Sequence, residues 1–494
     1  MRIKLLFILI FTSISVLSQN VKKIKILNTD NTFINKKNHP EYWRLVGNVS
    51  FNHNNTLMTC DSAYHYSKTN KIVAFSNVNI NKSDTLNLSG DKLYYDANSK
   101  YAKVVGNVKL ENNQNKLYTN QVNYDMNEDI LYYDSFGEII DKNQRITSKK
   151  GVYQINEKNY IFRDSVIVFG DNYTIYTQKM TYKSIVKENI MNGPSKIILK
   201  SNIIYCENGI FNSKNNLAYF SDNAQIISKN NTIKADSIFY NKTNNYAKAI
   251  NNVIIIDTIN NFKVIGGQAE LFEDEDKTII SKNPILYFPF EQDTLFMKGD
   301  KFVHTNTNNK KIIQLFNNVE IFKENFSGKC DSLSYSLSDS LIKMYKKPLM
   351  WIDDYQISSD SIEFLFFDET INKIFMNSNP IMISQIDSLD FNQIKGKKMT
   401  AFMKKNQINF INVIGNGESI YYLKDKKNKI GLNYIQSSNL TLHFNDKKLN
   451  NVIYKNMPIS VTTPYNDIIE SQRFLKDFNW KVKEKPGKFY TTEQ

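Results

Sequence analysis

Short runs in which apolar and polar residues alternate fill most of the chain, and turns rich in Asn and Lys separate them. Residues 233–240 are typical: Ile233 and Ala235 lie two positions apart, and so do Ile238 and Tyr240. A period of two is characteristic of a β-strand that buries one face. The pattern therefore predicts an all-β protein.

One unit of this pattern recurs along the chain. The unit has eight positions. The first and sixth are apolar, the third is small, the fourth is Asp or another polar residue, the eighth is aromatic, and the other three can be any residue. The small residue occurs thirteen times, at positions 60, 90, 119, 148, 177, 206, 235, 266, 299, 330, 359, 396 and 437. The first seven positions are separated by 30 and then five times by 29 residues, and later spacings widen to as much as 41. A fixed period of this length predicts stacked repeats, with loop insertions in the later copies.

The apolar phase changes inside each unit. From Ala235 to Ile238 the step is three, so both halves of the strand can face one interior only if it kinks at Asp236 and Ser237. A second strand runs through phrases such as Gly106-Asn107-Val108, about twelve residues before each small position. Two bent strands per unit predict two sheets that meet at an angle around an apolar trough. At 4.8 Å per strand, thirteen units would extend roughly 125 Å.

This phase assigns the candidate residues. The expected trough lining is Leu88, Leu93, Tyr95, Leu117, Val122, Tyr124, Ile233, Ile238 and Tyr240. The expected structural corners are Cys60, Gly90, Ala235, Asp236, Cys330, Asp331 and Asp360. The aromatic positions continue through Tyr153, Tyr182, Phe211, Tyr335 and Phe364, and the sequence leaves open which of them are core and which would contact a ligand.

The two ends of the chain differ from the repeats. Arg2 and Lys4, followed by an apolar stretch over residues 5–16, predict a secretion signal over residues 1–18, either cleaved or kept as an anchor. Apolar residues at helical intervals over 465–480 predict a short amphipathic helix. The expected organisation is a signal at 1–18, regular repeats at 19–260, repeats with insertions at 261–460, and a helix and tail at 461–494.

The composition favours strands and a basic surface. Tyr (29) and Phe (31) are abundant, whereas Gly (17) and Pro (9) are scarce. Without Arg2 and Lys4 the net charge falls from +14 to +12. A basic surface suits an anionic partner such as a lipid phosphate, although an AT-rich genome also favours Lys and Asn.

The recurring Ala-Asp-Ser-x-x-Tyr and Gly-Asn-Val phrases resemble the OstA-like family over about residues 44–445. That family includes the LptA-type periplasmic proteins of lipopolysaccharide transport and the N-terminal domain of LptD-type proteins. This chain is similar to its long versions in Bacteroidetes-type bacteria. The resemblance implies an elongated, V-shaped β-jellyroll whose trough holds acyl chains. It also implies sheet edges that join other Lpt-type proteins, or further copies of the chain, head to tail.

No pattern for catalysis, a cofactor or a metal is visible. Corner Asp residues in successive copies would lie roughly 10 Å apart, too far to share a metal ion, and Lys149 and Gln178 replace them in two copies. His65 and His304 stand at the aromatic position and are interpreted as packing residues. Cys60, Cys206 and Cys330 fall in repeats that are not adjacent, so we expect three unpaired thiols.

The sequence thus predicts a non-enzymatic periplasmic protein that binds lipopolysaccharide and bridges the inner and outer membranes, without nucleic acid as a partner. Two alternatives stay open. One is a structural or adhesive β-repeat rod, and the other is a β-helical polysaccharide-active enzyme.

Overall fold

The computed structural model describes residues 22–489, except 83–85, 113–114, 291–292, 309, 325, 368–369, 405–406 and 427. The signal expected at residues 1–18 lies outside this part of the chain. Most described residues are in β-strands, which confirms the predicted fold class, and none is in an α-helix. Accordingly, the described residues include no helix of the length and apolarity that a membrane span requires.

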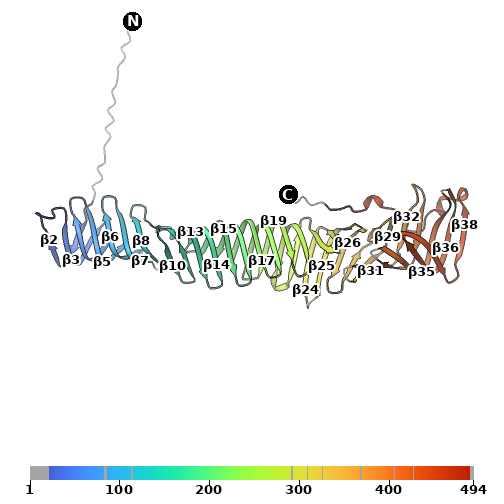
Figure 1. Ribbon diagram of the computed structural model, residues 1–494, viewed down its shortest axis with the longest axis horizontal. Coiled ribbons are helices and arrows are strands. Elements are labelled where there is room, and N and C mark those ends of the chain that lie inside the picture. Colours follow the sequence, from blue (N-terminus) through green and yellow to red (C-terminus); the bar gives the residue numbers. More distant parts are fainter. Residues whose placement is uncertain are drawn as a thin grey trace, which may run out of the picture. The chain divides into compact units, whose positions relative to one another are not determined.

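Two compact units meet at Gly193 and Pro194, and strands lie side by side along each of them (Figure 1). Unit 1 contains β1 (Lys25–Asn28), β2 (Asn31–Phe33), β3 (Trp43–His53), β4 (Thr56–Tyr66), β5 (Lys71–Lys82), β6 (Leu86–Asp96), β7 (Tyr101–Glu111), β8 (Asn115–Asp125), β9 (Ile130–Tyr133), β10 (Gly137–Asp141), β11 (Gln144–Ser148), β12 (Lys150–Gln154), β13 (Asn159–Gly170), β14 (Tyr173–Lys183) and the first part of β15 (Glu188–Leu199).

Unit 2 begins within β15, and its further strands vary more in length than those of unit 1. They are β16 (Asn202–Asn212), β17 (Leu217–Ser228), β18 (Asn231–Asn241), β19 (Tyr246–Asp257), β20 (Phe262–Phe272), β21 (Lys277–Ser281), β22 (Ile285–Phe290), β23 (Asp293–Lys298), β24 (Lys301–Thr307), β25 (Lys310–Lys323), β26 (Phe326–Ser336), β27 (Leu341–Tyr345), β28 (Leu349–Ile352), β29 (Tyr355–Ser358), β30 (Ser361–Phe367), β31 (Thr370–Asn377), β32 (Ile381–Gln385), β33 (Phe391–Lys395), β34 (Lys398–Lys404), β35 (Gln407–Asp425), β36 (Asn428–Asn445), β37 (Lys448–Lys455) and β38 (Ile459–Pro464). The 3₁₀ turn η2 (Glu273–Glu275) links β20 to β21.

Two consecutive residues with a left-handed backbone mark the bend in eight of the long strands. In β19, Asn251 and Asn252 have φ angles of 60° and 48°, and the pairing with β18 changes register there. Asn, Asp and Gly reach this conformation at the least steric cost. Among the described residues, the pairs at bends are 47–48, 76–77, 106–107, 164–165, 222–223, 251–252, 282–283, 317–318, 346–347, 378–379, 415–416 and 456–457, whereas the pairs 54–55 and 446–447 lie in hairpin turns.

Each change of register is a β-bulge, in which two residues of one strand face a single residue of its neighbour. The extra residue is on the strand next to the one that carries the small position and the Asp. Asp222 and Asn223 of β17 together face the single residue Asp236 of β18. The predicted change of phase in β18 is present, because Ala235 and Ile238 are both buried although they lie three positions apart. The extra residue of the bulge, however, is on β17 and not at Asp236 and Ser237. Asp236 instead accepts a hydrogen bond of 3.0 Å from Asn252 Nδ2.

The same Asp–Asn contact recurs in other repeats. Asn77 donates to Asp61, and Asn107 donates to Asp91, both at 2.9 Å. Asp331 instead forms an ion pair of 2.8 Å with Lys346. Asp360 takes part through its backbone, where its N–H donates to the Ser378 carbonyl at 3.2 Å. These aspartates hold the left-handed pair of the next strand in place.

The small positions lie on the inner side of the bend. At Gly90 an added Cβ would come within 2.5 Å of a Val104 methyl carbon, and Ala235 is only 6% exposed. Cys60, Cys206 and Cys330 are buried free thiols, and burial raises the pKa of each to about 12. Close approach of the neighbouring strand explains why only small side chains occur here.

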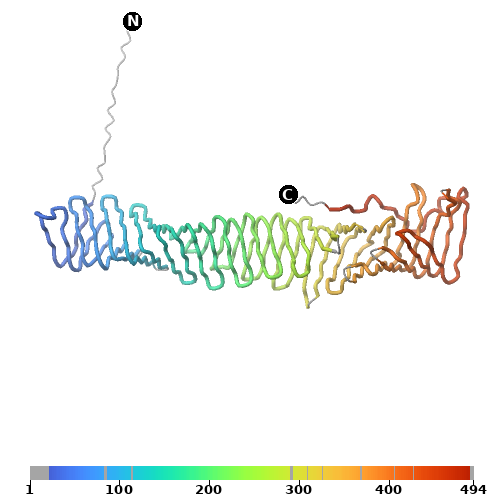
Figure 2. Tube along the Cα trace, viewed as in Figure 1, coloured from blue at the N-terminus to red at the C-terminus, as the bar shows by residue number. Residues whose placement is uncertain are grey.

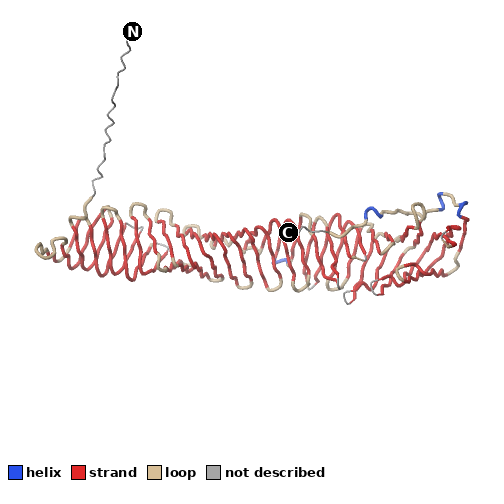
Figure 3. The backbone as a smooth tube through the Cα atoms, turned by 45° about the horizontal axis from the view of Figure 1, so that its top comes forward, coloured by secondary structure: helices blue, strands red, loops and turns tan. Residues whose placement is uncertain are grey.

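The segment after β38 does not form the helix that the sequence predicts. Its 3₁₀ turns are η3 (Tyr465–Asp467), η4 (Glu470–Gln472) and η5 (Val482–Glu484), and extended chain joins them. Figure 2 shows the red trace turning back over the orange and yellow strands of unit 2, and Figure 3 colours the turns blue. We call residues 465–489 the C-terminal strap. Its apolar residues dock one by one, as Leu475 does against Ile383 and Tyr422 on the outer side of the sheet.

Two glutamines replace the hydrogen bonds that a helix would have supplied. Gln393 donates to the Arg473 carbonyl at 2.7 Å and accepts from the Leu475 N–H at 2.8 Å. Gln356 makes the same two bonds further along the strap, at 2.6 and 2.7 Å. Both side chains are completely buried. Each amide therefore offers the strap the donor and the acceptor that a neighbouring strand would offer.

Substitutions of Asn252 test whether the left-handed backbone at the bend stabilises the fold. Asn252→Val places a β-branched residue at positive φ and removes the bond to Asp236, and should destabilise unit 2 by about 2 kcal/mol. Asn252→Gly keeps the conformation and should cost about 1 kcal/mol or less. Denaturant midpoints measure both. Lys234→Val, on an exposed site, is the control. Equal losses for Val and Gly would show that φ is not the constraint.

Acid should release the C-terminal strap, because Asp390 binds Arg473 and the Tyr465 hydroxyl of the strap. A hydrogen bond from Lys429 lowers the pKa of Asp387 to about 2. Burial acts to raise the pKa of Asp390, but bonds from Lys429 and from tyrosines outweigh it and lower that pKa as well. Unfolded Asp titrates near about 3.9, so this stabilisation is complete above roughly pH 4 and is lost as the pH falls towards about 2.

Tryptophan fluorescence measures this release, because Trp480 packs on Phe391 at 5.4 Å between ring centroids. A red shift confined to the range below about pH 4 is expected. Trp480→Phe should abolish the shift and separates it from signals of the other tryptophans. A shift complete by about pH 5 would exclude these carboxylates as its cause.

Candidate ligand-binding interior and its seam

The predicted lining residues face the interior between the two sheets. The six in unit 1 are Leu88, Leu93, Tyr95, Leu117, Val122 and Tyr124, and each is at most 2% exposed. In unit 2, Ile233 is 7% exposed, Ile238 is 1% exposed and Tyr240 is half-buried. Side chains therefore fill this part of unit 1, where the sequence led us to expect an open trough, and only unit 2 exposes part of the lining.

Hydrogen bonds across the side opposite the corners explain why this interior is closed. We call this side, where the turns of the two sheets face each other, the seam. His53 ends β3 in one sheet, and its Nδ1 lies 2.5 Å from the Tyr95 hydroxyl of the other. Burial lowers the pKa of His53, so the neutral ring can accept from Tyr95 at Nδ1 and donate from Nε2 to the Lys22 carbonyl at 2.9 Å.

A comparable bond closes each of the next two repeats. Lys82 pairs with Asp129, which also accepts from the Tyr124 hydroxyl at 3.1 Å. In the following repeat, Asn112 donates to the hydroxyls of Tyr153 and Tyr160, at 3.0 and 3.1 Å. We call these contacts seam bonds.

The fourth seam bond is ionic. Asp141 accepts from the Tyr182 hydroxyl and from Lys187 Nζ at 2.7 Å. Gln144 adds a bond of 3.0 Å to Asn189 beside it. Burial and the neighbouring Asp141 raise the pKa of Tyr182, so its hydroxyl stays protonated and able to donate.

The sequence contained a signal for this row that the repeat pattern alone did not disclose. One half consists of His53, Lys82, Asn112 and Asp141, spaced by 29, 30 and 29 residues. The other half is the aromatic series Tyr95, Tyr124, Tyr153 and Tyr182, spaced by 29. The hydroxyls of these tyrosines, two of which we predicted as lining, belong to the seam.

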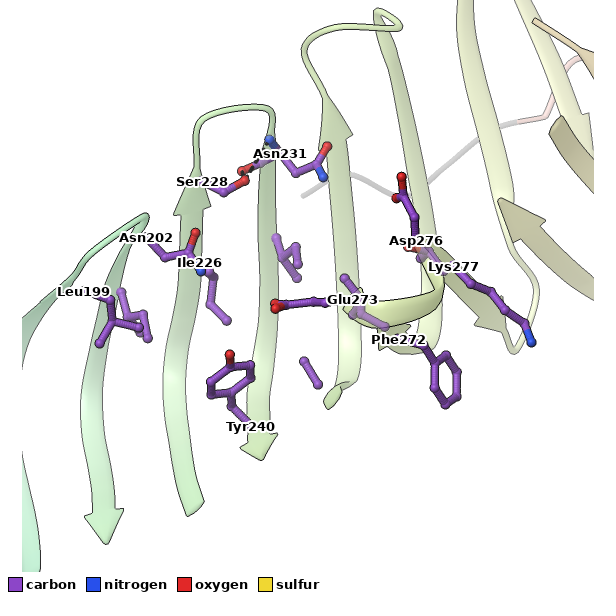
Figure 4. A pocket seen from close by; sticks show the side chains of 15 residues that line it. Leu199, Asn202, Ile226, Ser228, Asn231, Tyr240, Phe272, Glu273, Asp276 and Lys277 are labelled. Atoms are coloured by element: carbon purple, nitrogen blue, oxygen red, sulfur yellow. Dashed lines mark hydrogen bonds between the residues drawn. The ribbon is translucent and has the colours of Figure 1, made fainter. Parts of the chain in front are cut away.

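Unit 2 has a cavity of 130 Å³ on its seam, and Figure 4 shows its walls. The apolar part is formed by Leu199, Ile204, Ile226, Ile233, Ala247 and Leu271. Polar and charged side chains surround it, among them Asn202, Asn231, Glu273, Asp276 and Lys277. Tyr240 comes from β18 and Glu273 from the turn η2, and both point into the cavity (Figure 4).

A second cavity of 50 Å³ shares Ile233, Leu271 and Asp276 with the first, and reaches Phe302 and His304. Burial lowers the pKa of His304. Within the described ranges, no three His, Cys, Asp or Glu side chains lie close enough together to hold a metal ion. The arrangement therefore offers an apolar space with a polar rim.

Comparison with known proteins gives a family for the N-terminal part of the chain. Residues 21–178 match the family model described as OstA-like protein. No curated protein matches the sequence. One similar solved structure is LptH of Pseudomonas aeruginosa, described as the LptA homologous periplasmic component of the lipopolysaccharide transport device. It is 8% identical, with a TM-score of 0.20, over 22% of this chain and 80% of LptH.

Removing one hydroxyl tests whether the seam bonds hold the sheets together. Tyr124→Phe leaves the ring in place and should weaken the seam locally by about 1 kcal/mol. Hydrogen exchange should then quicken in the turn at residues 126–129 and in the first residues of β6. Tyr118→Phe, on the exposed side of the same strand, is the matched control. Unchanged exchange in Tyr124→Phe would mean that packing alone closes unit 1.

Proposed function

Because residues 21–178 match the family model described as OstA-like protein, we propose that this chain binds lipopolysaccharide by its acyl chains and carries it through the periplasm. The observation that best supports this is the seam cavity of unit 2, which combines an apolar wall with a polar rim. Each methylene that leaves water contributes about 0.8 kcal/mol, so acyl chains between the sheets need no polar contact. The headgroup would stay in solvent.

Some of the predicted lining residues could contact the ligand in the present structure, whereas others could do so only after the two sheets separate. Ile233 and Tyr240 already line the cavity. Leu88, Leu93 and their neighbours in unit 1 touch only other side chains until the two sheets part at the seam, because they are at most 2% exposed. A chain that moved through unit 1 would therefore have to break seam bonds and replace side-chain packing as it went.

The outer strands suggest how such a carrier would join its partners. Among the described residues, β1 and β2 pair only with β3, and β37 and β38 pair only with β36. Their other edges leave backbone N–H and C=O groups for the strand of another protein. We propose these edges as contacts for other Lpt-type proteins, or for a second copy head to tail, in a bridge between the two membranes. The role is transport without catalysis.

Crosslinking at neighbouring positions tests lipid binding in cells. A small aliphatic diazirine amino acid at Ile233, on the cavity wall, should capture lipopolysaccharide, which mass spectrometry of the adduct identifies. The same residue at Lys234, one position away and exposed, should capture at least tenfold less, because successive strand residues face opposite sides. Equal capture at both sites, or none at any lining position, would refute the proposed function.

A further inference from the structure

The row of seam bonds does not continue in the same form into unit 2. After Gly170, which ends β13 in unit 1 and has no side chain, the positions that follow in register on the same sheet are Leu199, Ser228 and Asp257. Leu199 has no polar side-chain group. The Ser228 hydroxyl donates to the Asn231 carbonyl of its own turn at 3.0 Å. Asp257 accepts from its own turn too, from the N–H of Asn260 at 2.8 Å.

A bond between the two sheets is present again further along, where Lys311 Nζ donates to Asn260 Oδ1 at 3.0 Å. The 130 Å³ cavity lies between Leu199 and this bond, and both Leu199 and Ser228 are among its walls. Within unit 2, the register positions that make no bond to the other sheet therefore lie along the hollow part of the seam.

We propose that this opening, around residues 199–278, is the place where the alkyl chain of an amphiphile passes between the sheets from the side. The four seam bonds of unit 1, from His53 to Asp141, keep the interior beside them closed to lateral access. The inference rests on the proposed function and adds to it a defined point of access.

The charges at the rim indicate how the ligand approaches. Glu273 and Asp276 are both at the cavity, whereas Lys277 is already paired with Glu275 at 3.2 Å. Two carboxylates and one paired ammonium group do not attract a phosphate. The alkyl end of the ligand therefore enters first, and an anionic headgroup stays away from this rim. The apolar wall continues towards the second cavity through Ile233 and Leu271.

Site-specific capture by the purified full chain tests the access point. The diazirine amino acid is placed at Leu199 or at Leu93, and each protein is mixed with lipopolysaccharide or with the uncharged amphiphile dodecyl maltoside. We expect capture of both at Leu199, at least tenfold faster than at Leu93. Lys82→Ala combined with Tyr124→Phe should speed capture at Leu93 several-fold and leave Leu199 unchanged.

The outcomes separate this inference from the proposed function. Capture of lipopolysaccharide at Leu93 as fast as at Leu199 would overturn the access point and leave lipopolysaccharide binding intact. Capture of dodecyl maltoside alone at Leu199 would support an alkyl access point and refute lipopolysaccharide as the ligand. Capture at neither site would refute both.

A rim variant tests the approach without altering the apolar wall. Glu273→Lys should speed capture of lipopolysaccharide at Leu199 several-fold and leave dodecyl maltoside unchanged, because only the former is anionic. Asp274→Lys lies in the same turn, outside the cavity wall, and leaves the pair of Lys277 with Glu275 in place, so it is the matched control. An equal effect of Glu273→Lys on both amphiphiles would show that the rim does not act through charge.

Discussion

The fold depends on one constraint, which is that each strand must change sheet without turning its apolar face outward. Side chains alternate along a strand, so a plain bend would leave one half of the strand facing solvent. Two left-handed residues facing one residue of the neighbouring strand correct this phase. At the bend between β18 and β19 the correction lets Ile233 and Ile238 of β18 share one interior although they lie an odd number of positions, five, apart. The repeat and its small inner position follow from this device.

The sequence disclosed the interior well because burial follows directly from the period of two. Ile233, Ala235 and Ile238 are buried as their phase predicts. The bulge was assigned to the wrong strand because the Asn251–Asn252 pair was recognised as a recurring phrase without its backbone conformation. At Lys346–Lys347, where φ is 63° and 56°, the side chains themselves give no signal. There the positions of the neighbouring repeats are the only guide.

Contacts far apart in the sequence account for what could not be predicted. The C-terminal strap has helical spacing, but Gln393 and Gln356 bind its backbone from more than 80 residues away. Local propensity is a weak constraint when buried side chains offer a full set of hydrogen bonds. Tyr95 and Tyr124 were assigned to the lining by the phase of their rings. Their hydroxyls are at the seam, because a buried hydroxyl requires a partner and His53 and Asp129 provide one.

The corners and the seam differ in how readily they can open. A corner combines backbone pairing on both sides with close packing around a small residue, as at Gly90, so separating it would disturb whole strands. A seam bond joins two side chains, and its net contribution is only about 1 kcal/mol, or somewhat more where a charge takes part. Thermal fluctuation can break such bonds one at a time while the backbone ladder stays intact. If the sheets part, they will therefore part at the seam and pivot at the corners. The left-handed pairs that set the phase of the strands would then also serve as the hinge.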